Sequence, residues 1–236
     1  MDNRLDIDWN QKGKKWVVCF DLLGFTEFVK GNDLVSVFYR WELCFAQFRN
    51  NLRNHPQLNY AHFSDTFLIY AKDDSLGKFH QIESCSRWFF SHALLYRLPL
   101  RGAMACDEFY ADRTNGVFLG KGLVEAHEYG ENFNWIGYTL SPTVLSRLNH
   151  TPSHYRKSNV QNKSNQNEET IALLCGLGKG RDYILALNEM KQQSVASLKL
   201  KGKTANEIMR VESKYDNAIA FIQKFEIAGT ENSPAL

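Results

Sequence analysis

Two aspartates stand where a carboxylate could hold a metal ion. Asp21 ends an apolar run of strand length, and a turn containing Gly24 follows it. Asp65 lies in a short Ser-Asp turn between two apolar segments, 58–63 and 67–71. Carboxylates on turns of adjacent strands can share a pair of divalent cations. Taken singly, each aspartate is better explained as a helix cap or a hairpin residue, so it is the pair that favours a metal site.

Two further features predict phosphate binding close to these aspartates. The turn formed by Gly24, Phe25 and Thr26 precedes an expected helix, and backbone N–H groups in such a place are suited to phosphate oxygens. Arg101 opens a later strand and could pair with a terminal phosphate. A surface arginine at the end of a strand explains Arg101 equally well.

The elements that must position these residues alternate between strands and helices. Apolar residues recurring every three or four positions, together with capping residues, predict helices at 25–30, 33–53, 76–97, 120–129, from 141, and at 204–226. Apolar runs and turn residues predict strands at 16–21, 58–63, 67–71, 100–106, 108–110, 117–119, 135–140, 171–175 and 182–187.

This order predicts an α+β fold with a ferredoxin-like βαββαβ core. The sheet should be mixed and mainly antiparallel, with helices on one face and an added C-terminal helix. The polar stretch 151–170 is expected to be an exposed or mobile loop rather than a linker. We therefore expect residues 1–236 to form a single domain with a core over about 16–188.

Composition restricts the function classes. Hydrophobic residues make up 44% of the 236, enough for a sizeable core, and the net charge of +2 does not suggest general nucleic-acid binding. Five cysteines without CxxC spacing indicate reduced thiols in a cytoplasmic protein, and the seven histidines lack the spacing of a zinc site. The N-terminus is polar, so no signal peptide is expected, and no apolar run approaches the roughly 20 residues of a membrane span.

These motifs resemble class III nucleotidyl cyclases. Residues 20–26 read Phe-Asp-Leu-Leu-Gly-Phe-Thr, Ser-Asp follows on the next hairpin, Leu-Arg-Gly-Ala stands at 100–103, and 118–126 look like the family's later helix start. The resemblance covers about 16–188. It implies that Asp21 and Asp65 bridge two Mn²⁺ or Mg²⁺ ions, with the Leu22 carbonyl completing one coordination shell. It also implies that the turn amides hold the β- and γ-phosphates.

Lys179 resembles a late phosphate-binding lysine of the same family, although a lysine in a loop is the simpler explanation. The chain looks most like the stand-alone pyrimidine cyclases of bacterial anti-phage (Pycsar) systems. This resemblance implies conversion of UTP to 3′,5′-cyclic UMP and pyrophosphate by a homodimer with active sites at the subunit interface. The product would act on a separate effector that responds to cyclic nucleotides.

The chain departs from the purine cyclases it resembles. In the helix expected here at 120–129, purine cyclases carry an Asn and, four residues on, an Arg. These places fall on Val124 and Glu128 in this chain. Their adenine-reading Lys falls near Ala61, and a base-reading Asp falls near Val117. These departures favour either a substrate whose base is not a purine or a domain without catalytic activity. Because the pair of aspartates is intact, a different base is favoured.

For the base pocket the sequence predicts Tyr60 and His62, because a larger side chain would fill the volume that a pyrimidine leaves empty. A tyrosine hydroxyl could also hydrogen-bond a pyrimidine edge. Three alternatives stay open at this point. They are a cytidylate cyclase, a purine nucleotide cyclase, and a catalytically silent cyclase-like domain that binds nucleotide.

Overall fold

The computed structural model of the chain describes residues 12–31, 33–164, 166–173 and 180–227. The strands are β1 (Gly13–Leu22), β2 (Leu58–Phe63), β3 (Thr66–Ala71), β4 (Leu100–Asp112), β5 (Val117–Leu119), β6 (Tyr138–Leu140), β7 (Tyr155–Gln161) and β8 (Asn167–Leu173). The helices are α1 (Phe25–Gly31), α2 (Leu34–Leu52), α3 (Leu76–Leu95), α4 (Lys121–Asn132), α5 (Pro142–Leu148), α6 (Gly180–Leu200) and α7 (Ala205–Ile222), and a π-helical turn, Gln223–Ile227, follows α7.

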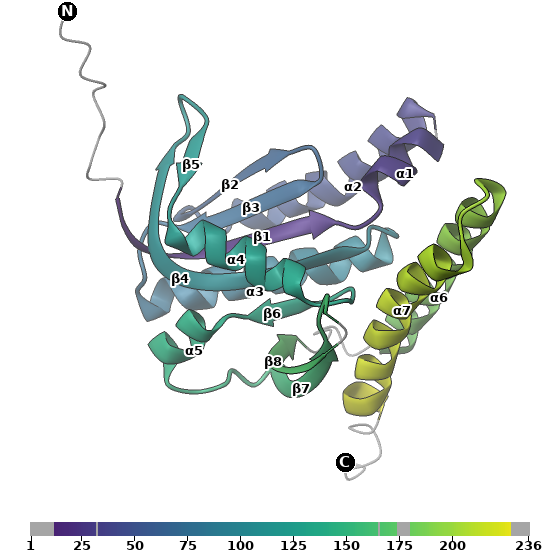
Figure 1. Cartoon of the computed structure of the whole chain (residues 1–236). Coiled ribbons are helices and arrows are strands. Elements are labelled where there is room, and N and C mark those ends of the chain that lie inside the picture. Colours follow the sequence, from purple (N-terminus) through teal and green to yellow (C-terminus); the bar gives the residue numbers. More distant parts are fainter. Residues whose placement is uncertain (1–11, 32, 165, 174–179, 228–236) are drawn as a thin grey trace, which may run out of the picture.

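One sheet runs through the molecule in the order β2-β3-β1-β4-β6-β8-β7, with β5 paired to β4 (Figure 1). Neighbouring strands are antiparallel except β4 and β6, which are parallel. The first four strands with α2 and α3 give the predicted ferredoxin-like βαββαβ core, and the predicted mixed, mainly antiparallel α+β fold is confirmed.

Side chains of β1 alternate between the two faces of the sheet. Trp16 and Phe20 join the large core beneath α2 and α3, whereas Val17 and Cys19 join two smaller clusters on the other face. Because successive strand residues point to opposite faces, Asp21 faces the same side as Val17 and Cys19.

Helix α4 covers that second face, and Figure 1 shows it on the opposite side of the sheet from α2 and α3. The prediction that the helices lie on one face is therefore wrong for α4. Small residues make its position possible. Ala126 packs on Cys19 and Ala105, and a Cβ added to Gly130 would come within 2.8 Å of the backbone of Gly102.

Two sequence assignments in the second half of the chain are also wrong. The polar stretch 151–170 is not a loop but holds β7 and the first part of β8, which pair with each other at the end of the sheet. Many polar side chains on these strands face solvent, while Tyr155 and Val160 are buried. The segment 182–187 belongs to α6, because Tyr183 and Leu187 are buried with the four-residue spacing of a helix.

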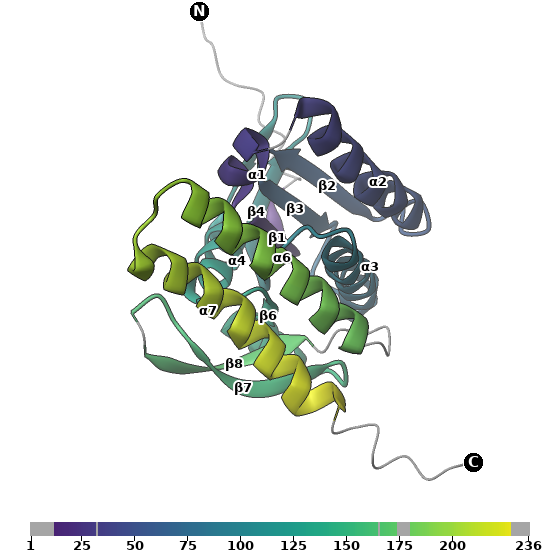
Figure 2. The same cartoon turned by 90° about the vertical axis from the view of Figure 1, so that its right-hand side faces the viewer.

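Helices α6 and α7 form a hairpin across the end of the sheet where β1 ends (Figure 2). A capping box starts α7, since Thr204 and Glu207 exchange hydrogen bonds there. Farther along α7, Phe221 meets Trp135 edge to face, with ring centroids 5.4 Å apart. The hairpin is thus part of the packed core. Within the described residues, no helix is long and apolar enough to cross a membrane.

Candidate functional site

The structure brings the two predicted aspartates together. Asp21, near the end of β1, lies directly opposite Thr66 on β3 and Arg101 on β4. The backbone N–H of Leu22 donates to the carbonyl oxygen of Asp65 at 2.9 Å, which ties the β2–β3 turn to the end of β1. The register of the sheet therefore determines that the turn carrying Asp65 lies beside Asp21.

A chain of ion pairs leads away from Asp21. Its Oδ2 accepts hydrogen bonds from Nε and Nη2 of Arg101 at 3.2 and 3.0 Å. The same Nη2 also donates to Oε1 of Glu131 at 2.5 Å, and Nζ of Lys163 donates to the other oxygen of Glu131 at 3.0 Å. Arg101 is buried, and such a guanidinium is tolerated only when it is paired.

Several negative charges converge at this place. Burial raises the pKa of Asp21, the charges of Asp65 and Glu131 raise it further, and Arg101 opposes them. Burial together with the charges of Asp21 and Glu131 raises the pKa of the neighbouring Cys19 to about 12. Cys19 therefore stays protonated and is no nucleophile.

The donor set fits a divalent cation. Carboxylate oxygens are hard ligands, and a cation between Asp21 and Asp65 would relieve the repulsion that raises the pKa of Asp21. In the part of the chain that the structure describes, no three His, Cys, Asp or Glu side chains gather into a metal site. The two predicted aspartates would supply the side-chain ligands. The Leu22 carbonyl, water and substrate oxygens would complete the coordination.

The predicted phosphate-binding residues are in part close to this site. Gly24 has φ +70°, which lets the chain turn directly after β1, and the N–H of Leu23 fixes the turn by donating to the carbonyl of Pro99 at 2.9 Å. Phe25 and Thr26 open α1, where the first backbone N–H groups have no partner within the helix. Lys179 lies outside the described residues.

Tyr60 and His62 are not brought together with Asp21. The ring of Tyr60 lies 5.5 Å from that of Phe48, and the ring of His62 lies 5.3 Å from that of Trp41, both on α2. Strand alternation thus points both residues to the face opposite Asp21. Their role in base binding stays a prediction.

An open groove of about 580 Å³ runs along the exposed side of α4. Val124 and Glu128, which the sequence resemblance placed at the Asn and Arg of the purine cyclases, line it. The remaining lining residues are Gly120, Lys121, Glu125, Tyr129 and Asn132. The groove belongs to the same side of the sheet as Asp21, because α4 covers that face.

Sequence reasoning missed three charged residues of this region. Glu131 and Lys163 complete the ion-pair chain, and Lys214 of α7 is electrostatically coupled to Arg101, Lys163 and Asp21. Lys163 stands in the stretch assigned to a loop, and Lys214 in an ordinary amphipathic helix. No spacing in the sequence connects either of them to Asp21.

No protein-family model matches the chain, and no curated protein matches it. Among solved structures, it is similar to the guanylyl cyclase Cya2 (13% identity, TM-score 0.51), covering 69% of this chain and 91% of that one. It is also similar to the adenylyl cyclase CyaB from P. aeruginosa (13% identity, TM-score 0.54), with 70% and 95% covered. A third similar structure is the guanylate cyclase domain of RhGC from Catenaria anguillulae in complex with GTP (8% identity, TM-score 0.54), covering 69% of this chain and 97% of that one.

The chain therefore has the fold of class III nucleotidyl cyclase domains. At these identities the likeness establishes the fold alone. Since nearly the whole of each neighbour is matched by about 70% of this chain, the protein also carries elements additional to that shared fold.

Proposed function

We propose that this protein is a nucleotidyl cyclase that converts UTP to 3′,5′-cyclic UMP and pyrophosphate. The observation that carries the proposal is the placement of Asp21 beside the Asp65 turn, with Arg101 paired to Asp21, in a cyclase fold. Oxygen ligands next to a guanidinium suit a substrate that brings both cations and phosphates.

The reaction is an internal displacement at phosphorus. The ribose 3′-oxygen forms a bond to the α-phosphorus and loses its proton, while the bond from the α-phosphorus to the bridging oxygen breaks and pyrophosphate leaves. Divalent ions held by Asp21, Asp65 and the Leu22 carbonyl would neutralise the charge that develops on the phosphates and lower the pKa of the ribose 3′-hydroxyl. Mg²⁺ and Mn²⁺ both match the ligand type.

The residues of the chain orient the substrate. Arg101, now shared between Asp21 and Glu131, would turn part of its donor fork to a phosphate oxygen when the triphosphate arrives. The backbone N–H groups at Gly24, Phe25 and Thr26 would donate to the other phosphates. Because Glu131 still holds Arg101, the guanidinium keeps its position while its partner changes.

The choice of UTP rests on the resemblance to stand-alone pyrimidine cyclases. Val124 and Glu128 support it, since neither residue can act as the Asn and Arg of purine cyclases. We further propose that the product is a second messenger in anti-phage defence, read by a separate effector protein.

The test is incubation of the purified protein with each of the four NTPs and Mn²⁺ or Mg²⁺, with products separated by chromatography and identified by mass. The expected result is cyclic UMP, with CTP used less well and no product from Asp21→Asn. Cyclic AMP or cyclic GMP as the main product would overturn the pyrimidine assignment. If no nucleotide gave a cyclic product, the cyclase proposal would fail and the catalytically silent domain would be the remaining alternative.

We also propose that the active unit is a homodimer in which one subunit holds the metal ions and the other contributes the groove on α4. Support comes from the groove, which is exposed on the same side of the sheet as Asp21. Val124→Trp should fill the groove, because Val124 is largely exposed. Mixing inactive Val124→Trp and Asp65→Ala chains should restore one working site per heterodimer. No recovery on mixing, or full activity of a monomer in sedimentation, would overturn the dimer.

A further inference from the structure

Helix α7 is fixed against the end of α4 by two hydrogen bonds. Nδ2 of Asn134 donates to the hydroxyl oxygen of Ser213 at 2.9 Å, and Nδ2 of Asn217 donates to the carbonyl of Asn134 at 2.8 Å. Ser213 and Asn217 stand immediately before and one turn after Lys214. The helix is therefore anchored on both sides of this lysine.

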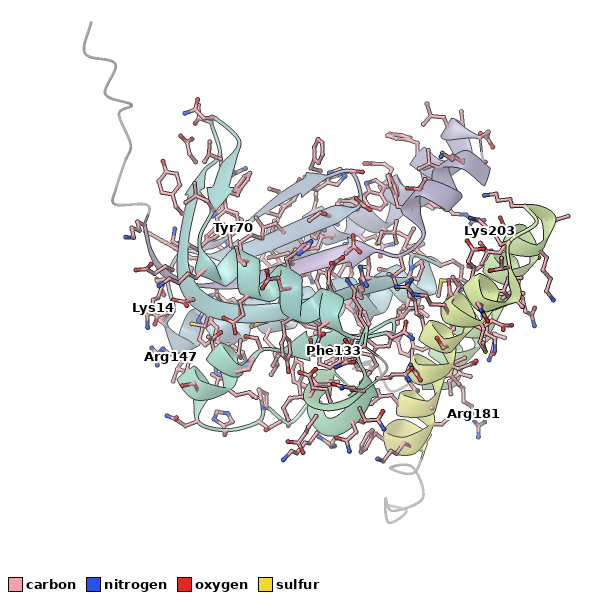
Figure 3. All side chains as sticks on the ribbon, in the orientation of Figure 1. Lys14, Tyr70, Phe133, Arg147, Arg181 and Lys203 are labelled. Carbon is pink, nitrogen blue, oxygen red and sulfur yellow. The ribbon has the colours of Figure 1, made fainter. Side chains whose placement is uncertain are left out.

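The segment after α4 also holds the β7–β8 turn. The N–H of Lys163 donates to the carbonyl of Asn132, and the N–H of Asn134 donates to the carbonyl of Gln161, both at 2.8 Å. Phe133, which stands between Asn132 and Asn134 in the chain and is labelled in Figure 3, is fully buried. Because Glu131 binds Arg101, this short segment joins the Asp21 site, the β7–β8 turn and α7 at one place.

Lys214 is half-buried at this junction, and its charged surroundings are mainly positive. The charged groups near enough to shift its pKa are Arg101 of β4, Lys163 of the β7–β8 turn, Arg210 of α7 and the carboxylate of Asp21. Arg101 and Lys163 are both paired with Glu131. Among the residues that the structure describes, no acceptor forms a hydrogen bond or an ion pair with the ammonium group of Lys214.

Such an arrangement is unfavourable in the absence of a ligand. Burial, with the charges of Arg101, Arg210 and Lys163, lowers the pKa of Lys214 to about 8. A half-buried cation without a partner costs stability, and such groups are concentrated at sites that bind or react. A polyanion in contact with Lys214 would remove this cost.

We propose that Lys214, with Arg210 one helical turn before it, binds the terminal phosphates of the nucleoside triphosphate whose reacting end lies at Asp21 and Asp65. Residues four apart lie on the same side of a helix, so both cations can reach one polyphosphate chain. The inference rests on the proposed cyclase function and adds to it a binding residue from the C-terminal hairpin. The triphosphate would then be bound from the sheet by Arg101 and from the hairpin by Lys214.

The experiment measures binding of inorganic tripolyphosphate to the full chain by calorimetry, in parallel with cyclic UMP formation. Lys214→Ala should weaken tripolyphosphate binding at least tenfold and raise KM for UTP, Arg210→Ala should have a smaller effect, and Lys214→Arg should retain most of the affinity. Lys199→Ala, at an exposed lysine in the last turn of α6, is the matched control and should behave as wild type. Melting temperatures of all variants show that each is folded.

The two proposals fail separately. If wild type forms no cyclic product but binds tripolyphosphate in a Lys214-dependent manner, the cyclase assignment is lost and the phosphate-binding role of Lys214 remains. If wild type makes cyclic UMP and Lys214→Ala keeps full affinity and KM, the role of Lys214 is refuted. Failure of wild type to bind tripolyphosphate also refutes it.

Discussion

Arg101 lies directly opposite Asp21 in the β1–β4 pair and donates two hydrogen bonds to one oxygen of its carboxylate, at 3.2 and 3.0 Å. The pairing is set by the strand register, so both side chains are positioned by main-chain hydrogen bonds rather than by a loop. Arg101 therefore holds the carboxylate in place.

The first prediction concerns the aspartates. Asp21→Asn and Asp65→Asn should each lower cyclic product formation by about a thousandfold, because the ligands that hold the charge-stabilising ions are lost. Far-ultraviolet circular dichroism should be unchanged. Glu169→Gln, an exposed acid paired with Lys157 on β7, is the control and should keep wild-type turnover. Substantial activity in both aspartate variants would remove the metal assignment.

A second prediction concerns the coupling between Arg101 and Asp21. Arg101→Leu should lower the free energy of unfolding by about 3 kcal/mol, since it leaves two carboxylates without their buried partner. In the double variant with Asp21→Asn, the loss of unfolding free energy should be smaller than the sum of the losses in the two single variants by about 1–3 kcal/mol.

The matched control for this cycle is the more exposed pair of Arg147 and Asp74. Its coupling, measured in the same denaturant titrations, should be below about 1 kcal/mol. Equal coupling in the two pairs would show that the Arg101–Asp21 pair is an ordinary surface ion pair.

A third prediction separates base reading from packing at Tyr60. Its ring stacks near Phe67 and meets Phe48 edge to face, so Tyr60→Ala should destabilise the protein by about 2–3 kcal/mol. Tyr60→Phe keeps the ring and should preserve stability, whereas loss of the predicted contact between the tyrosine hydroxyl and the base should change the ratio of UTP to CTP turnover. An unchanged ratio in Tyr60→Phe would leave Tyr60 as a packing residue only.

A fourth prediction concerns pH and Lys214. Its pKa is lowered to about 8 in the folded protein, against an ordinary value of 10.5. Between these values the unfolded chain binds more protons than the folded one, so Lys214 adds stability as pH rises from about 8 towards 10.5. Buried cysteines such as Cys19 titrate in both proteins, so the quantity to measure is the difference in unfolding free energy between wild type and Lys214→Met, which should rise over this range. A parallel pH dependence in the variant would contradict it.

The sequence by itself determined the first half of the fold and the aspartate pair. Hydrophobic periodicity and the Ser-Asp turn place β1, β2 and β3 correctly, because each element is defined by local pattern and turn chemistry. Once these strands pair, Asp21 and Asp65 must lie together, since both stand at the same end of adjacent antiparallel strands.

Only the tertiary structure decided the rest. β7 carries too few apolar residues to be recognised as a strand, and its conformation comes from pairing with β8. The grouping of Arg101, Glu131, Lys163 and Lys214 depends on contacts between residues far apart in the chain. Local patterns carry no information on such contacts, because they are set by how α4, the β7–β8 turn and α7 pack against one another.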